Sequence, residues 1–304
     1  MTPVAVLITI ASYFLILFTI SYIAGRKADN EGFFVGNRKS AWYVVAFAMI
    51  GSSISGVTFV SVPGMVGISN FSYLQMVLGF VTGQIIIAFV LIPLFYRMNL
   101  VSIYEYLENR FGTSSYKTGA WFFFISKILG AAVRLYLVCL TLQLLVFEPF
   151  HMPFIMNVIL TVALVWLYTF RGGVKSLIWT DSLKTFCLIV SVVLCIYYIS
   201  TDLKLSFTEM FSTVSDSALS HMFFFDNVND KRYFFKQFLA GVFTMIAMTG
   251  LDQDMMQRNL SCKNFKDSQK NMITSGISQF FIILLFLMLG VLLYTCLLYT
   301  SPSP

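Results

Sequence analysis

The segment from Ala41 to Gly67 is long enough to cross a lipid bilayer, yet its middle does not favour a continuous helix. At the depth of the bilayer midplane it carries a cluster of glycine and hydroxyl residues: Gly51, Ser52, Ser53, Ser55, Gly56 and Thr58. Because lipid offers no partner for an open backbone, a break at this depth must be enclosed by protein. An unwound helix there would turn its carbonyl groups toward an ion or a solute. The alternative is an unbroken helix whose small residues allow close packing against another helix.

Long apolar runs recur along the whole chain, which is 58% hydrophobic and only 11% charged. This pattern predicts an all-α polytopic membrane protein. We expect eight transmembrane helices, at about residues 3–25, 41–67, 71–96, 118–147, 154–171, 177–199, 234–251 and 271–297. The loops on one side carry most of the lysines and arginines. This bias places those loops in the cytoplasm and the N-terminus outside the cell membrane, whether plasma or inner membrane.

The polar residues argue against several other classes of protein. The five cysteines are scattered without a CxxC pair, and the two histidines, His151 and His221, lie outside the expected spans. Neither a metal cluster nor a disulfide framework is therefore implied. The net charge of +6 comes mostly from short loops between spans, so it does not indicate nucleic-acid binding. The few charged residues within the spans are not spaced as an acid–base pair, so we do not expect an enzyme.

Three further patterns accompany the segment at 41–67. They are LIPLFYRMNLVSIYEYLENRFG at 91–112, YTFRGGVKSLIWTD at 168–181 and TGLDQDMMQR at 249–258. Each is only moderately specific by itself. In this order and on these spans, the four patterns together resemble the solute:sodium symporter family, and the resemblance covers residues 1–295.

The resemblance implies a five-plus-five inverted-repeat (LeuT-like) fold with one extra N-terminal helix. Residues 1–295 would form a single transmembrane transporter domain that holds the first repeat and the start of the second. Residues 296–304 resemble a non-native tail, and three core helices are expected to be missing, so we interpret the chain as a fragment. The family also implies a sodium ion bound by the backbone carbonyls of Gly51 and Ile54. Oxygen ligands suit this hard cation, although both residues could simply pack.

The branch of this family that moves sialic acids matches the chain residue by residue. In that branch, hydroxyl groups on the broken helix, a Phe and a Gln one turn apart on the next helix, and an intramembrane Arg line the substrate. The corresponding residues here are Ser53, Ser55, Thr58, Phe71, Gln75 and Arg134. The alternative is local: the hydroxyl groups could cap their own helix ends, and the other side chains could pack.

Arg134 lies near the middle of the expected fourth span. A charge at that depth costs at least ~2.5–3.5 kcal/mol and is expected to face the interior with a partner. The second, third and fourth spans contain no Asp or Glu. A guanidinium without an internal acid is suited to hold a substrate carboxylate in a two-point fork. It could instead bond backbone carbonyls of an unwound helix.

Asp181 opens the sixth span, and two interpretations of it remain. Its carboxylate could interact with the helix dipole, or, as the family resemblance implies, it could lie on the ion path or at a second sodium site. Lys184, three residues on, is placed to pair with it. We expect Lys127 to extend toward the lipid headgroups, and Asp252 and Arg258 to hold the end of the seventh span against its neighbours.

These features predict a sodium-coupled secondary active symporter that imports a carboxylated sugar, such as sialic acid, by alternating access. Its partners would be a small organic anion and the lipid bilayer. Two alternatives remain at this stage: a proton-coupled carrier of the same fold, and a transporter-derived membrane sensor.

Overall fold

The computed structural model describes residues 3–25, 40–100, 102–169 and 173–300. The first helices are α1 (Pro3–Gly25), α3 (Trp42–Ser53), α4 (Gly56–Ser69), α5 (Tyr73–Ile86), η2 (Ile87–Leu91), α6 (Ile92–Arg97), α7 (Ile103–Phe111), α8 (Thr113–Leu142), η3 (Gln143–Phe147) and η4 (Glu148–Phe150). They are followed by α9 (Phe154–Thr169), α10 (Gly173–Asp202), α11 (Phe207–Asp216), η5 (Ala218–Ser220), α12 (Phe234–Met245), η6 (Ile246–Gly250), α13 (Gln253–Leu260) and α14 (Phe265–Thr300). No strand occurs in these ranges, and the β-type contact found there is a bridge between Ser40 and Cys262. The expected all-α class is therefore confirmed.

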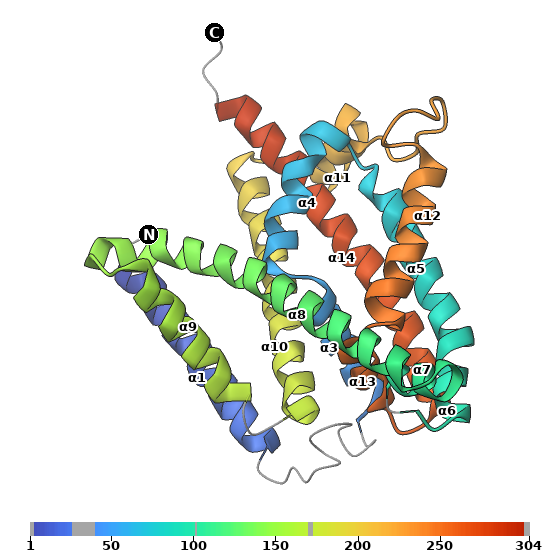
Figure 1. The fold of residues 1–304 in the computed structure, drawn as a ribbon. Coiled ribbons are helices and arrows are strands. Elements are labelled where there is room, and N and C mark those ends of the chain that lie inside the picture. The colour runs from blue at the N-terminus through green and yellow to red at the C-terminus, as the bar shows by residue number, and fades with distance from the viewer. Residues whose placement is uncertain (1–2, 26–39, 101, 170–172, 301–304) are drawn as a thin grey trace.

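The centre of the molecule is a bundle of long helices (Figure 1). α10 packs along α3, α12 packs along α5, and α14 touches α3, α4, α5 and α10. Apolar side chains from these helices fill the core, among them Met49, Val77, Ile283, Phe286 and Leu287, each at most 2% exposed. An apolar composition alone does not explain this burial, because apolar side chains are equally stable when they face lipid. The burial reflects close packing between helices.

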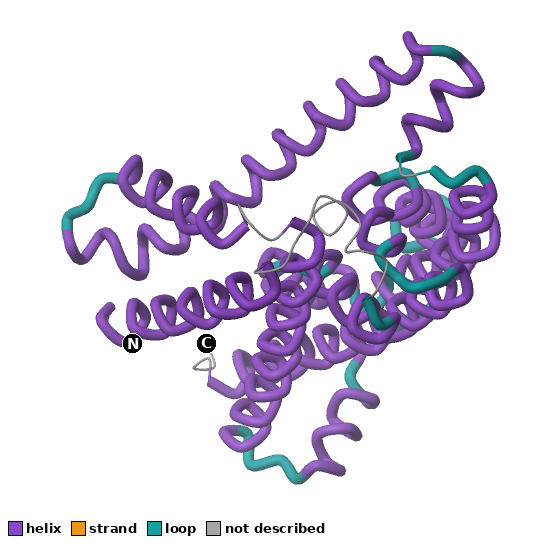
Figure 2. The backbone as a smooth tube through the Cα atoms, turned by 90° about the horizontal axis from the view of Figure 1, so that it is seen from below, coloured by secondary structure: helices purple, strands orange, loops and turns teal. Residues whose placement is uncertain are grey.

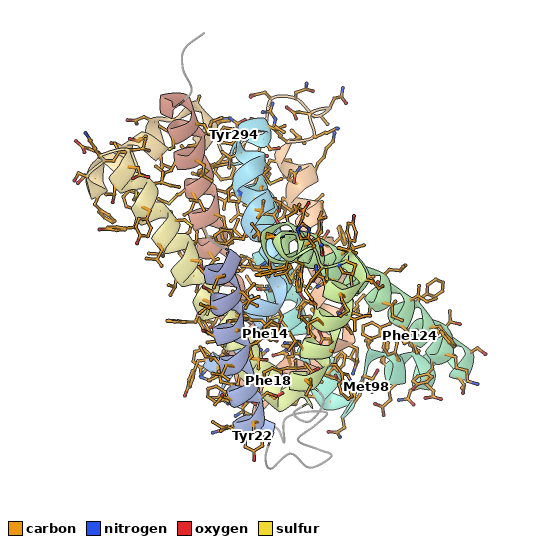
Figure 3. All side chains as sticks on the ribbon, turned by 90° about the vertical axis from the view of Figure 1, so that its left-hand side faces the viewer. Phe14, Phe18, Tyr22, Met98, Phe124 and Tyr294 are labelled. Atoms are coloured by element: carbon orange, nitrogen blue, oxygen red, sulfur yellow. The ribbon has the colours of Figure 1, made fainter. Side chains whose placement is uncertain are left out.

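α1, α8 and α9 lie at the side of this bundle, and α8 crosses it at a slant (Figures 1 and 2). α1 packs on α9 and α10, while α8 packs chiefly on α7, η3 and α9. Large apolar side chains remain exposed on these helices. Tyr22 is 62% exposed on α1 and Phe124 is 54% exposed on α8, and both are labelled in Figure 3. An exposed apolar surface of this extent is typical of helices that face lipid or another part of a protein.

Two of the helices are bent sharply. α3 and α4 meet at an angle of 64°, and the α12–η6 segment meets α13 at 69°. Within the described ranges, five helical segments are long and apolar enough to cross a membrane, or up to seven if each bent pair is one crossing. α9, which corresponds to the expected span at 154–171, is shorter, with an apolar part from Phe154 to Leu167. The model thus agrees with a multi-span helical protein, while the expected count of eight stays a prediction.

Several sequence-based expectations fall outside the described residues. Arg26, Lys27, Arg38, Lys39 and Arg171, which contribute to the basic loops, belong to this set, as does the end of the expected tail, at 301–304. The remaining basic loop residues gather at one end of the bundle, where α6, α7 and α13 lie (bottom of Figure 1). We call this the α13 end. It carries Arg97, Arg110, Lys117, Lys263, Lys266 and Lys270.

The backbones of α5 and α12 approach each other closely at two glycines. A Cβ atom placed on Gly79 would overlap the carbonyl oxygen of Phe238 and lie 2.9 Å from the Cα of Gly241. A Cβ on Gly241 would in turn overlap the carbonyl oxygen of Met76. Only glycine fits at both positions, because any side chain would push the two helices apart.

Candidate functional site

The break between α3 and α4 consists of two residues in extended conformation. Ile54 has φ −98° and ψ 121°, and Ser55 has φ −109° and ψ 170°. The last helical hydrogen bond of α3 runs from the Ile54 N–H to the Ile50 carbonyl, at 2.8 Å. The carbonyls from Gly51 to Ile54 follow that last bond and lack helical partners. The interpretation of this segment as a broken helix is therefore confirmed, and the unbroken alternative is wrong.

A capping box starts the second half of the broken helix. The Thr58 N–H donates to Ser55 Oγ at 3.4 Å, and the Ser55 N–H donates to Thr58 Oγ1 at 3.3 Å. Ser53 lies on the other side of the break, where its hydroxyl donates to the Met49 carbonyl at 2.9 Å. All three side chains are half-buried. The hydroxyl groups thus support the helix ends in this conformation, as the local alternative proposed, and their contact with a substrate stays a prediction.

Helix α10 places two oxygen atoms, Thr185 Oγ1 and the Asp181 carbonyl oxygen, next to Gly51 near the end of α3. A Cβ placed on Gly51 would overlap Thr185 Oγ1 and lie 2.6 Å from the Asp181 carbonyl oxygen. The Thr185 hydroxyl donates to the Phe47 carbonyl at 2.7 Å and to the Asp181 carbonyl at 2.9 Å. Glycine is required here because the two backbones nearly touch. The result is a group of carbonyl and hydroxyl oxygens beside the break, a donor set that fits a hard cation.

Phe71 and Gln75 lie at the opposite end of α4, beside the loop that precedes α12. Gln75 is fully buried, and its Nε2 donates to the Arg232 carbonyl at 2.8 Å. Its Oε1 accepts from the Phe224 N–H at 3.3 Å, while the Phe71 N–H donates to the His221 carbonyl at 3.1 Å. Both residues therefore hold this loop. The structure does not gather them with the hydroxyl groups of the break, and their substrate role stays a prediction.

Arg134 is exposed on α8. Its Nε donates to the carbonyl of Gly130 in the same helix, at 3.0 Å. The bond stays within the continuous helix α8, so it is not the contact with an unwound helix that the alternative interpretation proposed. A role in binding a substrate carboxylate stays a prediction.

Asp181 is the centre of a buried charged cluster. Its side chain is only 4% exposed, and its carboxylate pairs with Lys184 at 2.8 Å and with Arg258 from α13. Ser52 completes the cluster: its hydroxyl donates to Asp181 Oδ2 at 3.1 Å and accepts from Arg258 Nη1 at 2.8 Å. The pairing with Lys184 follows the sequence-based expectation. A carboxylate that is nearly excluded from solvent requires such partners, because burying an unpaired charge is very unfavourable.

The sequence did not identify the partnership between Asp181 and Arg258. The two residues are 77 positions apart, and Arg258 was expected only to hold the end of the seventh span against its neighbours, with no partner named. One signal was available: both charges border apolar segments, where opposite charges tend to pair. The cluster places Asp181 beside Ser52 and hence beside the break in α3.

The second break follows η6 and has a different chemistry. Leu251 and Asp252 separate η6 from α13, and Asp252 Oδ1 caps α13 by accepting from the N–H groups of Asp254 and Met255, at 3.0 and 3.2 Å. This break lies within the TGLDQDMMQR pattern at 249–258. Lys127 from α8 lies here as well, with its Nζ 2.6 Å from Asp252 Oδ2. Lys127 thus has an acidic partner that the sequence did not indicate, and its extension to the headgroups stays a prediction.

Two discontinuous helices within one bundle of apolar helices are the architecture typical of secondary membrane transporters. A family model described as the sodium:solute symporter family matches residues 33–302 of the chain. The chain therefore belongs to the sodium:solute symporter family, whose members are transporters.

Several relatives are similar to the chain over much of its length. Human sodium-coupled monocarboxylate transporter 2 is 25% identical over 272 residues, which are 89% of this chain and 43% of the human protein. The sodium/sialic acid symporter NanT of Aliivibrio fischeri is 26% identical over 269 residues, covering 84% of this chain and 50% of NanT. The human sodium/iodide cotransporter is 24% identical over 285 residues, covering 92% of this chain and 43% of that protein. The chain thus spans about half the length of the curated relatives it matches.

A solved structure has the same fold. It is the substrate-bound outward-open state of a Na⁺-coupled sialic acid symporter, which superimposes with a TM-score of 0.83 at 21% sequence identity. The match covers 96% of this chain and 62% of that chain. At this identity the likeness establishes the fold, while the residues that bind solute or ion must be argued from the chain itself.

Proposed function

We propose that this chain forms the first part of a sodium-coupled symporter that imports a small organic anion. The observation that carries the proposal is the break at Ile54 and Ser55, where four successive carbonyls follow the last hydrogen bond of α3. Open carbonyls inside a helical bundle are the usual means by which transporters of this architecture bind an ion at mid-membrane. Coupling to sodium agrees with the family and with the oxygen donors beside the break.

For the ion, we propose that the carbonyls of Gly51 and Ile54 bind sodium and that Asp181 lies on the ion path below them. Ile54 is buried, so its carbonyl is shielded from lipid and bulk water. Asp181 lies one helix away and is connected to the end of α3 by its hydrogen bond with Ser52. One sodium ion that enters across 100 mV contributes about 2.3 kcal/mol before any concentration gradient, which is enough to drive uptake of a scarce solute.

For the solute, we propose a carboxylated compound, with sialic acid as the first candidate. The relatives named above transport monocarboxylates, sialic acid and iodide, so small anions are the common chemistry. Ser53, Ser55, Thr58, Phe71, Gln75 and Arg134 are the residues proposed to contact it. In the present conformation they are divided among the break, the loop end and α8, so substrate binding would require α8 to approach the break.

For the orientation, we propose that the α13 end faces the cytoplasm of a cell, beneath the plasma or inner membrane, with the N-terminus outside. The basic residues named above cluster at that end, and such clusters favour the cytoplasmic side.

The test uses a full-length protein that contains this chain, reconstituted into proteoliposomes. Uptake of sialic acid, a short monocarboxylate and iodide is measured with an inward sodium gradient and with choline in place of sodium. We expect uptake of at least one carboxylated compound in sodium only. Uptake that follows a pH gradient without sodium would reject sodium coupling, and uptake of iodide alone would reject the carboxylate.

The role of Arg134 is tested in the same preparation. Arg134→Ala should abolish binding of the carboxylated solute while the protein still folds, because the fork for the carboxylate is lost. Lys117→Ala on the same helix is the matched control. Equal solute affinity in Arg134→Ala and the control would remove Arg134 from the site.

A further inference from the structure

Six charged side chains form a continuous series of alternating sign at the α13 end. We call this series the charge chain; its members in order are Lys184, Asp181, Arg258, Asp254, Lys127 and Asp252. The first pair is the contact of Lys184 with Asp181 at 2.8 Å, followed by the contact of Asp181 with Arg258. Arg258 Nη2 then lies 3.3 Å from Asp254 Oδ1, and Lys127 Nζ lies 3.9 Å from Asp254 Oδ2 and 2.6 Å from Asp252 Oδ2.

The charge chain connects four helices, and its most buried members lie next to Ser52. Ser52 joins it to the end of α3, while its members come from α10, α13 and α8. The exposed fraction of the side chains is 4% for Asp181 and 9% for Arg258, and it is higher on both sides of this pair, at 36% for Lys184, 42% for Asp254 and 34% for Lys127. The Asp181–Arg258 pair is therefore protected, while the charges on either side of it can exchange with water. Exposed charges of this kind separate more readily than buried ones.

Asp252 uses its two carboxylate oxygens for two different tasks. Oδ1 accepts the backbone N–H groups of Asp254 and Met255, which fixes the first turn of α13. Oδ2 accepts from Lys127, which fixes α8 to the same turn. α13 is only eight residues long, and Arg258 projects from it toward Asp181. A shift in the first turn of so short a helix moves Arg258 as well.

We propose that Lys127 and Asp252 are positioning residues that orient α13 so that Arg258 stays on Asp181 and the α13 end remains closed. This inference deepens the proposed function, because the same contact would separate the ion at the break from the cytoplasm. When Lys127 leaves Asp252, α13 rotates away, Arg258 leaves Asp181, and the end opens. Lys127 acts on the ion path through α13 and touches neither ion nor solute.

The protein contains a reporter of this opening. Cys262 lies in the connection between α13 and α14 and is fully buried. Burial raises the pKa of its thiol to about 12, so little reactive thiolate is present at neutral pH. Movement of α13 would expose Cys262 to water and increase its reactivity. Cys139, fully buried in α8, reports on general loosening of the protein.

The experiment measures the rate of alkylation of Cys262 by N-ethylmaleimide in the chain as it stands, purified in detergent and resolved by peptide mass spectrometry. Lys127→Met should speed the reaction roughly fivefold, the effect of losing about 1 kcal/mol of pairing. Asp252→Asn should do the same, because Asn caps a helix as well as Asp but cannot hold Lys127 by charge. The double variant should react no faster than either single variant.

Two further variants separate positioning from general support. Lys127→Arg keeps the charge and should restore the slow reaction, whereas Lys117→Met on the same helix should leave it unchanged. Unaltered labelling of Cys262 in Lys127→Met and Asp252→Asn overturns the proposal. An equal increase at Cys139 also overturns it, because the pair would then support the whole fold. The assay needs no transport, so its result is independent of whether sodium drives uptake.

Discussion

The two helix breaks are built from opposite chemistry. The break between α3 and α4 consists of the uncharged residues Ile54 and Ser55, and its capping bonds between Ser55 and Thr58 are long, at 3.3 and 3.4 Å. The break before α13 is surrounded by charge, with Asp252 capping the helix at 3.0 Å and pairing with Lys127 at 2.6 Å. At the first break the backbone carbonyls from Gly51 to Ile54 lack helical partners, while at the second both carboxylate oxygens of Asp252 are occupied.

This difference indicates a division of labour between the breaks. Neutral groups with weak mutual bonds can release one another when a ligand arrives, at little cost. A charged pair that is partly buried holds a defined geometry, and separating it costs more. The first break is therefore suited to bind, and the second is suited to hold two helices in a fixed arrangement. Four predictions test this contrast.

The largest effect is expected at the buried pair below the first break. Arg258→Met should lower the free energy of unfolding by about 3 kcal/mol, because Asp181 stays charged and buried with Lys184 as its remaining basic partner. Thermal unfolding in detergent measures the loss. The double variant Asp181→Asn with Arg258→Met should recover most of it, since no buried charge remains. A double variant that is less stable than the single one contradicts the argument.

The next effect concerns the fit of α3 against α10. Gly51→Ala should cost about 1–3 kcal/mol, because the added methyl group overlaps Thr185 Oγ1 and crowds the Asp181 carbonyl. Gly56→Ala is the matched control at the same break, where a Cβ has open space. The melting temperatures of the two variants provide the comparison. Equal melting temperatures would mean that α3 and α10 are not in close contact.

The two caps should differ in strength. Asp252→Ala should destabilise the first turn of α13 by about 1 kcal/mol or more, because it loses both the cap and Lys127. Ser55→Ala should cost about 0.5 kcal/mol, because its bonds with Thr58 are long. Amide hydrogen exchange in the first turns of α4 and α13 reports each effect. A larger effect for Ser55→Ala reverses the contrast between the breaks.

The smallest effect is expected at an exposed pair that serves as a reference. In the loop before α12, hydrogen bonds from Arg232 lower the pKa of Asp230 below its usual value near 3.8. A carboxyl group with a lowered pKa adds stability above its unfolded pKa and loses it as the pH falls through the folded one. Asp230→Asn should therefore be slightly less stable than the unaltered protein from pH 5 to pH 8, and the difference should disappear as the pH falls below about 4. A difference in thermal unfolding that persists or grows at low pH would contradict this assignment.

The sequence predicted the first break because several small and hydroxyl residues coincide at one depth of a long apolar segment. It also predicted the Asp181–Lys184 pair, whose members are three residues apart in one helix. It did not predict the ion pairs Asp181–Arg258 and Asp252–Lys127. Asp181 lies on a different helix from Arg258, and Asp252 lies at the bend before α13, whereas Lys127 belongs to α8. Local patterns determine local contacts, whereas contacts between distant segments depend on how the helices pack.

The close glycine crossing of Gly79 and Gly241 has a consequence for the transport cycle. With no side chain between the two backbones, α5 and α12 cannot slide or roll past each other without steric overlap. These two helices should move as one rigid unit, and the hinge for rocking has to lie at its border, where α14 packs on α5. In the proposed transport cycle, a crosslink between α5 and α12 should then leave turnover intact, while one between α5 and α14 should arrest it.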